Sequence, residues 1–276
     1  MAVVFLAPLA LMVVTAFKST REIFMNPFGL PASWSLEPFA RVWSRASFSV
    51  YFRNSVWVTG ASLALVLTCA SMASYAIARL PFRGRDWVYL FFLAGIMVPV
   101  RLGILPLFLL MKQLRLLDTH WALIFTYAAS GMPMSVFLLT GFLRSLPGEL
   151  REAARIDGCT EFQAFWKVML PLIRPALATV AIVNFVPWWN DMFFPLLFIQ
   201  SDRLKTIPLG MTIFFGQYQT DWGLLFSGMV LASLPLVALY LVMSRQFIAG
   251  LTAGAVKGCR GRVAAGAVLT GRATGR

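Results

Sequence analysis

The stretch Asn54 to Ala78, NSVWVTGASLALVLTCASMASYAIA, contains no Asp, Glu, Lys or Arg. A helix that crosses the hydrocarbon core of a bilayer needs about 20 mostly apolar residues, because each residue advances the helix by about 1.5 Å. This stretch is long enough, and it carries no charged side chain that would resist leaving water. The sequence therefore predicts a membrane-spanning helix over 54–78.

Four other stretches fit the same description. Two of them are free of Asp, Glu, Lys and Arg, and the other two each contain one charged residue, Arg101 or Asp191. A single charge is tolerated in a span when it faces a water-filled path or lies near the membrane surface. The four predicted spans are 87–111, 119–143, 175–200 and 222–244.

The first residues, 1–17, form a shorter apolar stretch. No basic segment precedes it and no convincing small-residue cleavage site follows it, so we interpret it as a spanning helix rather than a cleaved signal. Its start is consistent with truncation. With this stretch the chain has about six spans, which predicts an all-α polytopic membrane protein.

The composition agrees with a protein that uses lipid as its solvent. Of 276 residues, 59% are hydrophobic and only 13% are charged, too apolar a chain for one soluble core. The net charge of +13 could suggest nucleic acid, but the apolar runs leave little water-exposed surface for phosphates. Basic loops facing anionic lipid explain the charge better. Basic residues are more numerous in the loops that are cytoplasmic when both termini lie inside, which favours that orientation.

The longest patterned loop, 144–174, reads as two short helices on the cytoplasmic side. Pro147 suits a first helical turn, and Gly158 suits a helix stop. Thr160 and Gln163 match a capping box that begins the second helix, and we expect Pro171 to end it. Apolar residues at helical spacing predict one amphipathic face, formed by Phe162, Phe165, Trp166 and Met169.

Three short motifs in this loop are recognisable. They are Glu152-Ala153-Ala154, then Asp157-Gly158, then Leu170-Pro171, and together they resemble the EAA signature of ABC importer permeases. The fuller run 147–175 is similar to the carbohydrate-uptake branch, the relatives of the maltose and glycerol-phosphate permeases. The resemblance covers nearly the whole chain, through 54–55, 79–84, 189–191 and 250–258.

The resemblance implies that this loop docks on a separate ATP-binding subunit and transmits its closure to the spans. Glu152 would contact that subunit, Ala153 and Ala154 would permit close approach, and Gly158 would form the turn. Asp157, Leu170 and Pro171 belong to the same expected coupling site.

The family further implies four partners: an ATP-binding subunit, expected as a dimer, a second and different permease chain, an extracytoplasmic solute-binding protein, and the lipid of a bacterial or archaeal cytoplasmic membrane. ATP and Mg²⁺ would be bound by the partner, and no nucleic acid is expected.

Catalytic and metal-binding patterns are not found in the sequence. No G-x-x-x-x-G-K-[ST] loop is present to cradle nucleotide phosphates. The three cysteines, Cys69, Cys159 and Cys259, are too far apart in sequence to suggest a metal site or a disulfide framework, and His120 stands alone. We therefore expect no enzyme site, no metal and no cofactor in this chain.

Polar and aromatic residues near the end of the fifth predicted span are the candidates for a solute pathway. Trp188, Trp189 and Asn190 offer an aromatic face and an amide, which suit a sugar, and Asp191 beside them is an ionisable pathway candidate. The alternative is that Asp191 and the tryptophans lie at the membrane interface. Arg101 falls between Pro99 and Pro106, which predicts a kinked or broken span. We interpret the arginine as an interfacial anchor, and the alternative is a place on the solute pathway.

The sequence thus favours one permease domain, 1–258, followed by a basic and disordered tail, 259–276. The predicted function is that of a permease subunit for a sugar or sugar-like solute. The alternatives are a permease for amino acids or peptides, an intramembrane enzyme, or a membrane scaffold.

Overall fold

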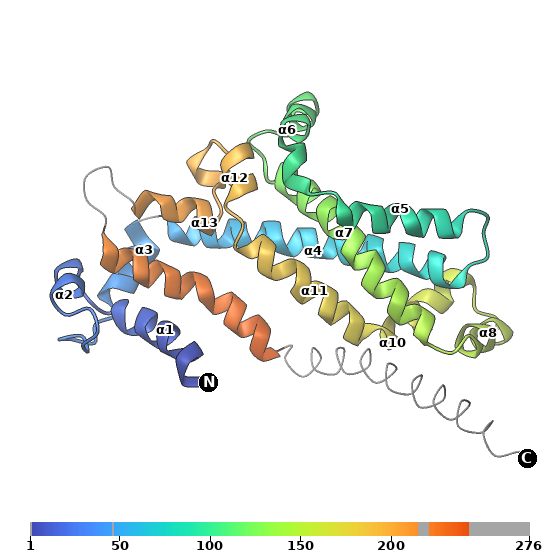
Figure 1. Cartoon of the computed structure of the whole chain (residues 1–276), viewed down its shortest axis with the longest axis horizontal. Helices are drawn as coiled ribbons and strands as arrows, with labels where there is room; N and C mark the ends of the chain where they lie inside the picture. The colour runs from blue at the N-terminus through green and yellow to red at the C-terminus, as the bar shows by residue number, and fades with distance from the viewer. Residues whose placement is uncertain (1, 46, 215–220, 243–276) are drawn as a thin grey trace, which may run out of the picture. The chain divides into compact units, whose positions relative to one another are not determined.

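The computed structural model describes residues 2–45, 47–214 and 221–242, and these described residues contain helices and no strand (Figure 1). The all-α prediction is confirmed. The chain divides into two compact units, each assembled from separate stretches. The first unit comprises Met1–Val66, Ala94–Pro133 and Asn184–Ala238, and the second comprises Leu67–Leu93, Met134–Val183 and Leu239–Arg276.

Three described helices are each long enough and apolar enough to cross a membrane. The predicted spans 54–78 and 119–143 fall within the first two almost entirely, and the third covers the described part of 222–244. Residues 243–244, the resembling run 250–258 and the tail 259–276 lie outside the described residues. The three helices are α4 (Phe48–Arg79), α7 (His120–Ser145) and Trp222–Val242.

The predicted span 87–111 is two helices rather than one. Helix α5 (Arg85–Met97) and the run Val100–Gln113, which contains the 3₁₀ turn η1 (Val100–Gly103) and α6 (Ile104–Gln113), meet at 84°. Proline disfavours a helical conformation at the residue before it, so Pro99 explains the break after Met97. The kink predicted beside Arg101 is confirmed.

The predicted span 175–200 is also broken. Helix α11 (Arg174–Trp189) ends before Asn190, and a short helix, α12 (Phe193–Phe198), follows. Two features stop the first helix: Pro187 lies in its last turn, and the Asp191 carboxylate accepts hydrogen bonds from the N–H groups of Phe193 and Phe194 (3.3 and 3.1 Å). The described helices supply up to five spans if two bent pairs each count as one: Arg85–Met97 with Val100–Gln113, and Glu161–Leu172 with Arg174–Trp189.

The first predicted span corresponds to α1 (Ala2–Thr15), an apolar helix shorter than the others. The segment after it contains α2 (Thr20–Met25) and α3 (Glu37–Arg45). Lys18 is fully buried there, and its ammonium donates to the carbonyl oxygens of Asn26 and Pro27 (2.9 and 3.2 Å). A buried charge is tolerated when polar partners replace its water, so this loop is held in a defined shape.

The remaining elements are short. In the second unit they are α8 (Glu149–Ile156), α9 (Glu161–Gln163), the π-helical segment η2 (Ala164–Met169) and α10 (Leu170–Leu172). In the first unit they are η3 (Asp202–Leu204), α13 (Ile207–Gly210) and η4 (Met211–Phe214).

The start of α4 is anchored by hydrogen bonds that explain two of the motif residues. The Asn54 amide donates to the carbonyl oxygens of Arg203 and Lys205 (both 2.9 Å), and the Ser55 hydroxyl accepts from the N–H of Ile207 (2.8 Å). Asn54 and Ser55 therefore fasten the segment 203–207 to the first turns of α4.

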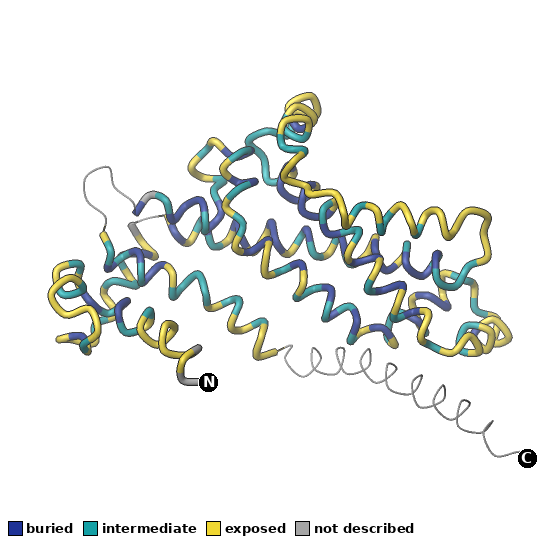
Figure 2. The backbone as a smooth tube through the Cα atoms, viewed as in Figure 1, coloured by how far each residue is buried: buried dark blue, intermediate teal, exposed yellow. Residues whose placement is uncertain are grey.

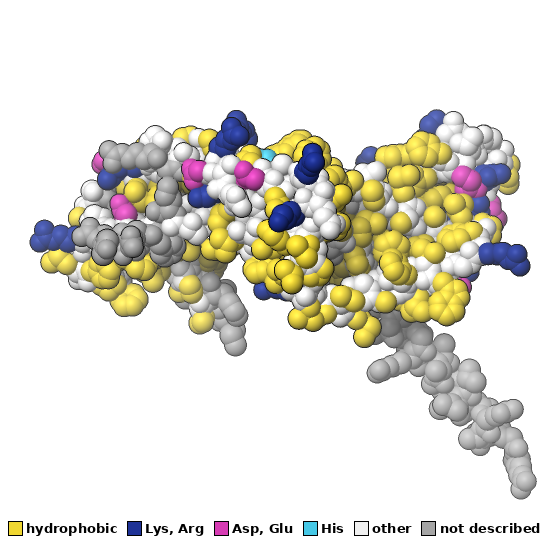
Figure 3. All heavy atoms as spheres, turned by 90° about the horizontal axis from the view of Figure 1, so that it is seen from above, with side chains coloured by type: hydrophobic (Ala, Val, Ile, Leu, Met, Phe, Trp, Pro, Cys, Tyr) yellow, Lys and Arg dark blue, Asp and Glu magenta, His cyan; other side chains and the backbone are white. Residues whose placement is uncertain are grey.

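Apolar side chains are abundant on the surface as well as inside. No residue of α5 is buried, and Trp87, Phe91 and Met97 are each at least 75% exposed. Figure 2 shows α5 exposed along most of its length, and Figure 3 shows hydrophobic side chains over much of one face. Apolar surface on this scale suits a chain surrounded by lipid rather than water.

Candidate coupling segment and solute pocket

The loop 144–174, which we name the coupling segment, contains a first helix that begins slightly later than predicted. Pro147 precedes α8 instead of lying in its first turn, and the chain enters the helix at Gly148, whose carbonyl oxygen accepts from Arg151 N–H (3.0 Å). Glu149 and Glu152 lie in the first turn, where carboxylates stabilise the positive end of the helix dipole.

Gly158 ends α8 as predicted, through a specific turn. Its φ is +82°, a left-handed conformation in which a side chain on Cβ is strained. Gly158 N–H donates to the carbonyl of Arg155 (3.1 Å), and Cys159 N–H donates to the carbonyl of Ala154 (3.0 Å). This pair of bonds is the Schellman motif, which satisfies carbonyl groups that would otherwise end the helix unpaired.

The second helix begins as predicted and ends later. Thr160 and Gln163 form the reciprocal capping box. The helix then continues through Pro171, contrary to the expectation that Pro171 would end it, and breaks at Ile173. The reason is η2: Leu170 N–H donates to the carbonyl of Phe165, five residues back, so the helix is already widened where the proline ring enters.

The predicted single amphipathic face is wrong. Phe165 and Met169 are buried at 3% and 0% exposure, whereas Phe162 and Trp166 are 63% and 42% exposed. Phe165 and Met169 lie four residues apart, as do Phe162 and Trp166, so each pair shares a side of the helix and only the first pair packs inside the chain. The exposed pair packs edge to face at 6.0 Å between ring centroids.

Glu161 is the polar centre of the coupling segment, and it was not predicted from the sequence. Its carboxylate accepts from Arg151 through two bonds, from Arg155 Nη1 (2.7 Å) and from the hydroxyl of Tyr75 on α4 (2.9 Å). The Arg151 guanidinium is the largest of the influences that lower the pKa of Glu161 to about 2. The spacing Arg151, Arg155 and Glu161 was visible in the sequence, but the partnership with Tyr75 was not.

The predicted coupling residues fall into two groups. Glu152, Ala153, Asp157 and Gly158 are exposed along one end of the segment, where a partner protein can reach them. Ala154 is only 5% exposed, so its small side chain serves packing within this chain, and Leu170 and Pro171 are half-buried. Close approach to a partner, if it occurs on α8, therefore depends on Ala153.

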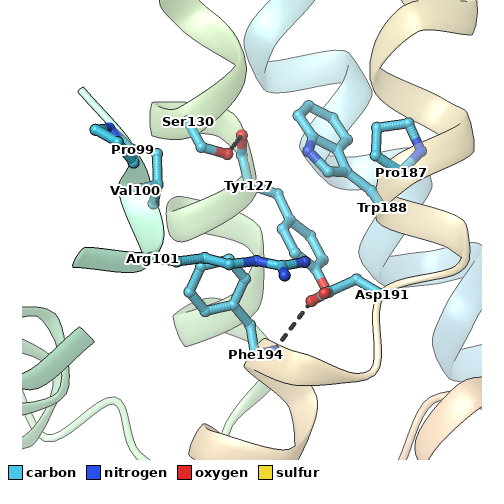
Figure 4. A pocket seen from close by; sticks show the side chains of 9 residues that line it. All are labelled: Pro99, Val100, Arg101, Tyr127, Ser130, Pro187, Trp188, Asp191 and Phe194. Atoms are coloured by element: carbon cyan, nitrogen blue, oxygen red, sulfur yellow. Dashed lines mark hydrogen bonds between the residues drawn. The ribbon is translucent and has the colours of Figure 1, made fainter. Parts of the chain in front are cut away.

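In the first unit, a pocket of about 410 Å³ opens beside the break between α5 and α6 (Figure 4). Asp191 faces it and accepts from the Tyr127 hydroxyl (2.8 Å) as well as from the two N–H groups of α12. Trp188 stacks on Tyr127 with 12° between the ring planes and 5.7 Å between centroids. The pocket is lined by Pro99, Val100, Arg101, Tyr127, Ser130, Pro187, Trp188, Asp191 and Phe194.

Arg101 belongs to this pocket instead of standing alone as an anchor. Its guanidinium lies over the Phe193 ring, 5.6 Å from the centroid, and Figure 4 shows it extending toward Tyr127 and Asp191. No carboxylate of the described residues lies within ion-pair distance of it. It therefore keeps donors that a polar molecule in the pocket can use.

The three predicted pathway residues do not line one site. Trp189 and Asn190 line a second pocket of about 330 Å³, with Met211, Leu225 and Met229 among its walls, whereas Asp191 lines the first. Trp189 is 3% exposed, stacks on Phe185 and donates to the carbonyl of Ala232 (3.0 Å). Burial of both tryptophans inside the protein argues against the interfacial alternative for them.

Within the part of the chain that the structure describes, no group of three His, Cys, Asp or Glu side chains could hold a metal ion. The predicted absence of catalysis and of cofactors is not tested by this observation.

Comparison with known proteins identifies the arrangement. The model of the binding-protein-dependent transport system inner membrane component matches residues 67–252, which include the whole coupling segment. The chain belongs to this family. The permease is 38% identical over 254 residues to the diacetylchitobiose uptake system permease protein NgcG of Streptomyces coelicolor, covering 91% of this chain and 84% of that one.

Other comparisons agree. The arabinooligosaccharides transport system permease protein AraQ of Halalkalibacterium halodurans is 36% identical over 255 residues, with 91% of each chain covered. A crystal structure of a bacterial ABC transporter that imports the acidic polysaccharide alginate has the same fold, with a TM-score of 0.80, 21% identity and coverage of 89% and 92%. The predicted family is confirmed, and a permease of this family works with an ATP-binding subunit and a solute-binding protein.

Proposed function

We propose that the permease forms part of the transmembrane pathway for a sugar or sugar-like solute and couples it to a separate ATPase. The observation that supports this cargo is the identity of 34–38% with permeases named for diacetylchitobiose, arabinooligosaccharides and melibiose, raffinose and stachyose, each over 91% of this chain. The alternative cargo is an amino acid or peptide.

The coupling segment transmits movement of the ATPase. Its two helices are joined at Gly158 by a turn whose N–H groups pair with carbonyls of α8, so the segment can move as one body. Glu152, Ala153 and Asp157 present a charged and sterically open surface at one end. Leu170 and Pro171 connect the segment to α11, through which motion passes to the membrane helices.

The solute passes the pocket beside Arg101 and Asp191. Trp188 supplies an aromatic surface, Ser130 a hydroxyl and Arg101 a donor, and together these suit the apolar faces and hydroxyl groups of a saccharide. Asn190 lines the second pocket and donates to the carbonyl of Val186 (2.8 Å), which leaves its amide oxygen available to a solute.

The remaining features of the complex follow from this role. ATP and Mg²⁺ are held by a dimeric ATP-binding subunit, a second and different permease completes the pathway, and no covalent chemistry takes place in this chain. Both termini and the coupling segment face the cytoplasm of a bacterial or archaeal cell.

Uptake by the reconstituted complex tests the cargo. Liposomes are prepared with both permeases and the ATPase in the membrane, ATP inside and the solute-binding protein outside. Labelled diacetylchitobiose, melibiose or a dipeptide is then added outside. Accumulation of a sugar that requires ATP supports the proposal. Accumulation of the dipeptide alone overturns the sugar assignment.

A charge reversal tests the coupling role. We expect Glu152→Lys to abolish stimulated ATP hydrolysis by weakening the contact with the ATPase, whereas Glu149→Lys, another exposed acidic residue of α8 with no ion pair among the described residues, keeps most of it. Unchanged assembly and hydrolysis in Glu152→Lys would exclude this contact.

A further inference from the structure

We propose that Glu161 is a positioning residue that clamps the coupling segment to α4, so that the segment and this helix move together when the ATPase closes. The proposal rests on the coupling role proposed above and adds a non-covalent connection to the covalent ones through α7 and α11.

The Glu161 carboxylate accepts four hydrogen bonds. Oε1 accepts from Arg151 Nη2 and from Arg155 Nη1, and Oε2 accepts from Arg151 Nε (3.1 Å) and from the Tyr75 hydroxyl (2.9 Å). A carboxylate offers about four acceptor positions, and all of them are in use. Bidentate pairing with Arg151 also fixes the direction of the carboxylate, because the guanidinium fork is planar and rigid.

The partners come from separate elements of the second unit. Arg151 and Arg155 lie one turn apart on α8, Glu161 opens α9 after the Gly158 turn, and Tyr75 belongs to α4. Tyr75 is 5% exposed, and its ring packs on Phe165 of η2 with 5.2 Å between centroids. One side chain of α4 therefore contacts both the polar centre and the apolar core of the coupling segment.

One turn further along α4, a second side chain on the same face contacts the start of the coupling segment. Arg79, four residues beyond Tyr75, donates through Nη2 to the carbonyl oxygens of Leu143 and Leu146, which end α7 and begin the coupling segment. Residues four apart lie on one face of a helix. The C-terminal end of α4 thus contacts the segment both where the chain enters it and at its centre.

The clamp is needed because the covalent connections are bent. The coupling segment turns at Gly158 and breaks at Ile173, where the helices on either side meet at 74°. A bent joint transmits force poorly unless side-chain contacts hold its angle. The Glu161 contacts supply that restraint to α4, and without them the two guanidinium groups of α8 would face each other without a counter-ion.

Two native cysteines allow the clamp to be measured directly. Cys69 lies on α4, Cys159 lies in the coupling segment, and both thiols are free. In a Cys259→Ser background they take one spin label each, and pulsed dipolar spectroscopy then gives the distribution of distances between them. The complete complex with its ATPase is measured without nucleotide and after trapping with ATP and vanadate.

The variants separate the clamp from a general stabilising role. Glu161→Gln removes the charge at constant size, and Tyr75→Phe removes only the bond that reaches α4. The matched controls are Glu149→Gln on α8 and Tyr240→Phe, an exposed tyrosine of the last described helix. A residue that only stabilises the fold would alter both nucleotide states equally.

We expect a narrow distribution in the wild type and in both controls in either state. In Glu161→Gln and Tyr75→Phe the distribution should become at least about twofold broader after trapping, because the pull of the ATPase is no longer shared with α4. A trapped distribution in Glu161→Gln as narrow as the wild type overturns the clamp. Broadening in Glu161→Gln without any in Tyr75→Phe overturns the link to α4. If the wild-type chain does not assemble with the ATPase, the proposed function itself is wrong.

Discussion

Two carboxylates organise two different regions of the permease in opposite ways. Glu161 in the coupling segment is surrounded by two guanidinium groups and one phenol, with its side chain 30% exposed. Asp191 in the pocket region accepts, among the described residues, only from neutral donors: the Tyr127 hydroxyl and two backbone N–H groups. One carboxylate links separate helices by charge, and the other caps a helix and orients a buried aromatic ring.

The difference follows from the surroundings. Near water, several charges can gather because the solvent still hydrates part of each group, and charge-assisted bonds then fix a surface loop. Around Asp191, the Tyr127 hydroxyl and two backbone N–H groups at a helix start satisfy the carboxylate without an ion pair among the described residues, although Arg101 lines the same pocket. The charged centre thus joins the coupling segment to α4, and the neutral one fixes the shape of the pocket region.

Charge reversal at the ionic centre should have the largest effect on stability. Glu161→Lys places a third cation beside Arg151 and Arg155 and should lower the free energy of unfolding by about 3 kcal/mol. Unfolding by SDS in mixed micelles measures this change. The control Glu149→Lys should stay within about 0.5 kcal/mol, and equal losses in the two variants would show that Glu161 has no special role.

Removing the pocket carboxylate should cost somewhat less. Asp191→Leu leaves the Tyr127 hydroxyl and two N–H groups of α12 without their acceptor, and Tyr127 is only 2% exposed. The free energy of unfolding should therefore fall by about 2 kcal/mol. Asp191→Asn keeps an acceptor oxygen and should lose less than about 1 kcal/mol in the same titration. A loss in Asp191→Asn as large as in Asp191→Leu would mean that charge, and not hydrogen bonding, matters here.

A substitution at the Gly158 turn should lower the free energy of unfolding by a smaller amount, through backbone strain alone. Gly158→Ala should destabilise the permease by about 1 kcal/mol because a Cβ is strained at a φ of +82°. Gly141→Ala, in α7 with no atom near the added Cβ, should be neutral or stabilising. Identical unfolding curves for Gly158→Ala and the wild type would contradict the left-handed turn.

The pH dependence should be the smallest effect near neutrality. The pKa of Glu161 is lowered to about 2 in the folded protein, so its contribution to stability is present above the unfolded pKa of about 4.5 and is lost only as the pH falls toward 2. The stability difference between the wild type and Glu161→Gln should therefore stay constant from pH 8 to pH 5 and shrink below pH 4. A difference that disappears between pH 7 and pH 5 would contradict the ionic centre.

The sequence predicted the helices better than their ends. The uncharged stretches 54–78 and 119–143 correspond to α4 and α7, since hydrophobic length is a local property of the chain. The predicted span 175–200 was wrong as a single helix, whereas 87–111 is broken where a kink was predicted. Pro99, Pro187 and the residues of the Asp191 cap on α12 were visible, but the bond that Asp191 accepts from Tyr127, 64 residues away, depends on the tertiary fold.

In the coupling segment, too, local features were predicted and long-range features were not. The Gly158 turn and the capping box of Thr160 and Gln163 were predicted because each depends on residues within a few positions. The amphipathic face was wrong, because only Phe165 and Met169 of its residues are buried, and which side is covered depends on the elements packed against the helix. Glu161 was missed since its partner Tyr75 lies 86 residues away.

The sequence by itself determined the class of protein, the family and the helix–glycine–helix form of the coupling segment, because apolar length, capping and glycine conformation are local. Only the tertiary structure assigned Trp189 and Asn190 to one pocket and Asp191 to another, buried Ala154, and brought Tyr75 to Glu161. These features depend on which helices pack together, and packing is decided by side chains that are distant in the chain.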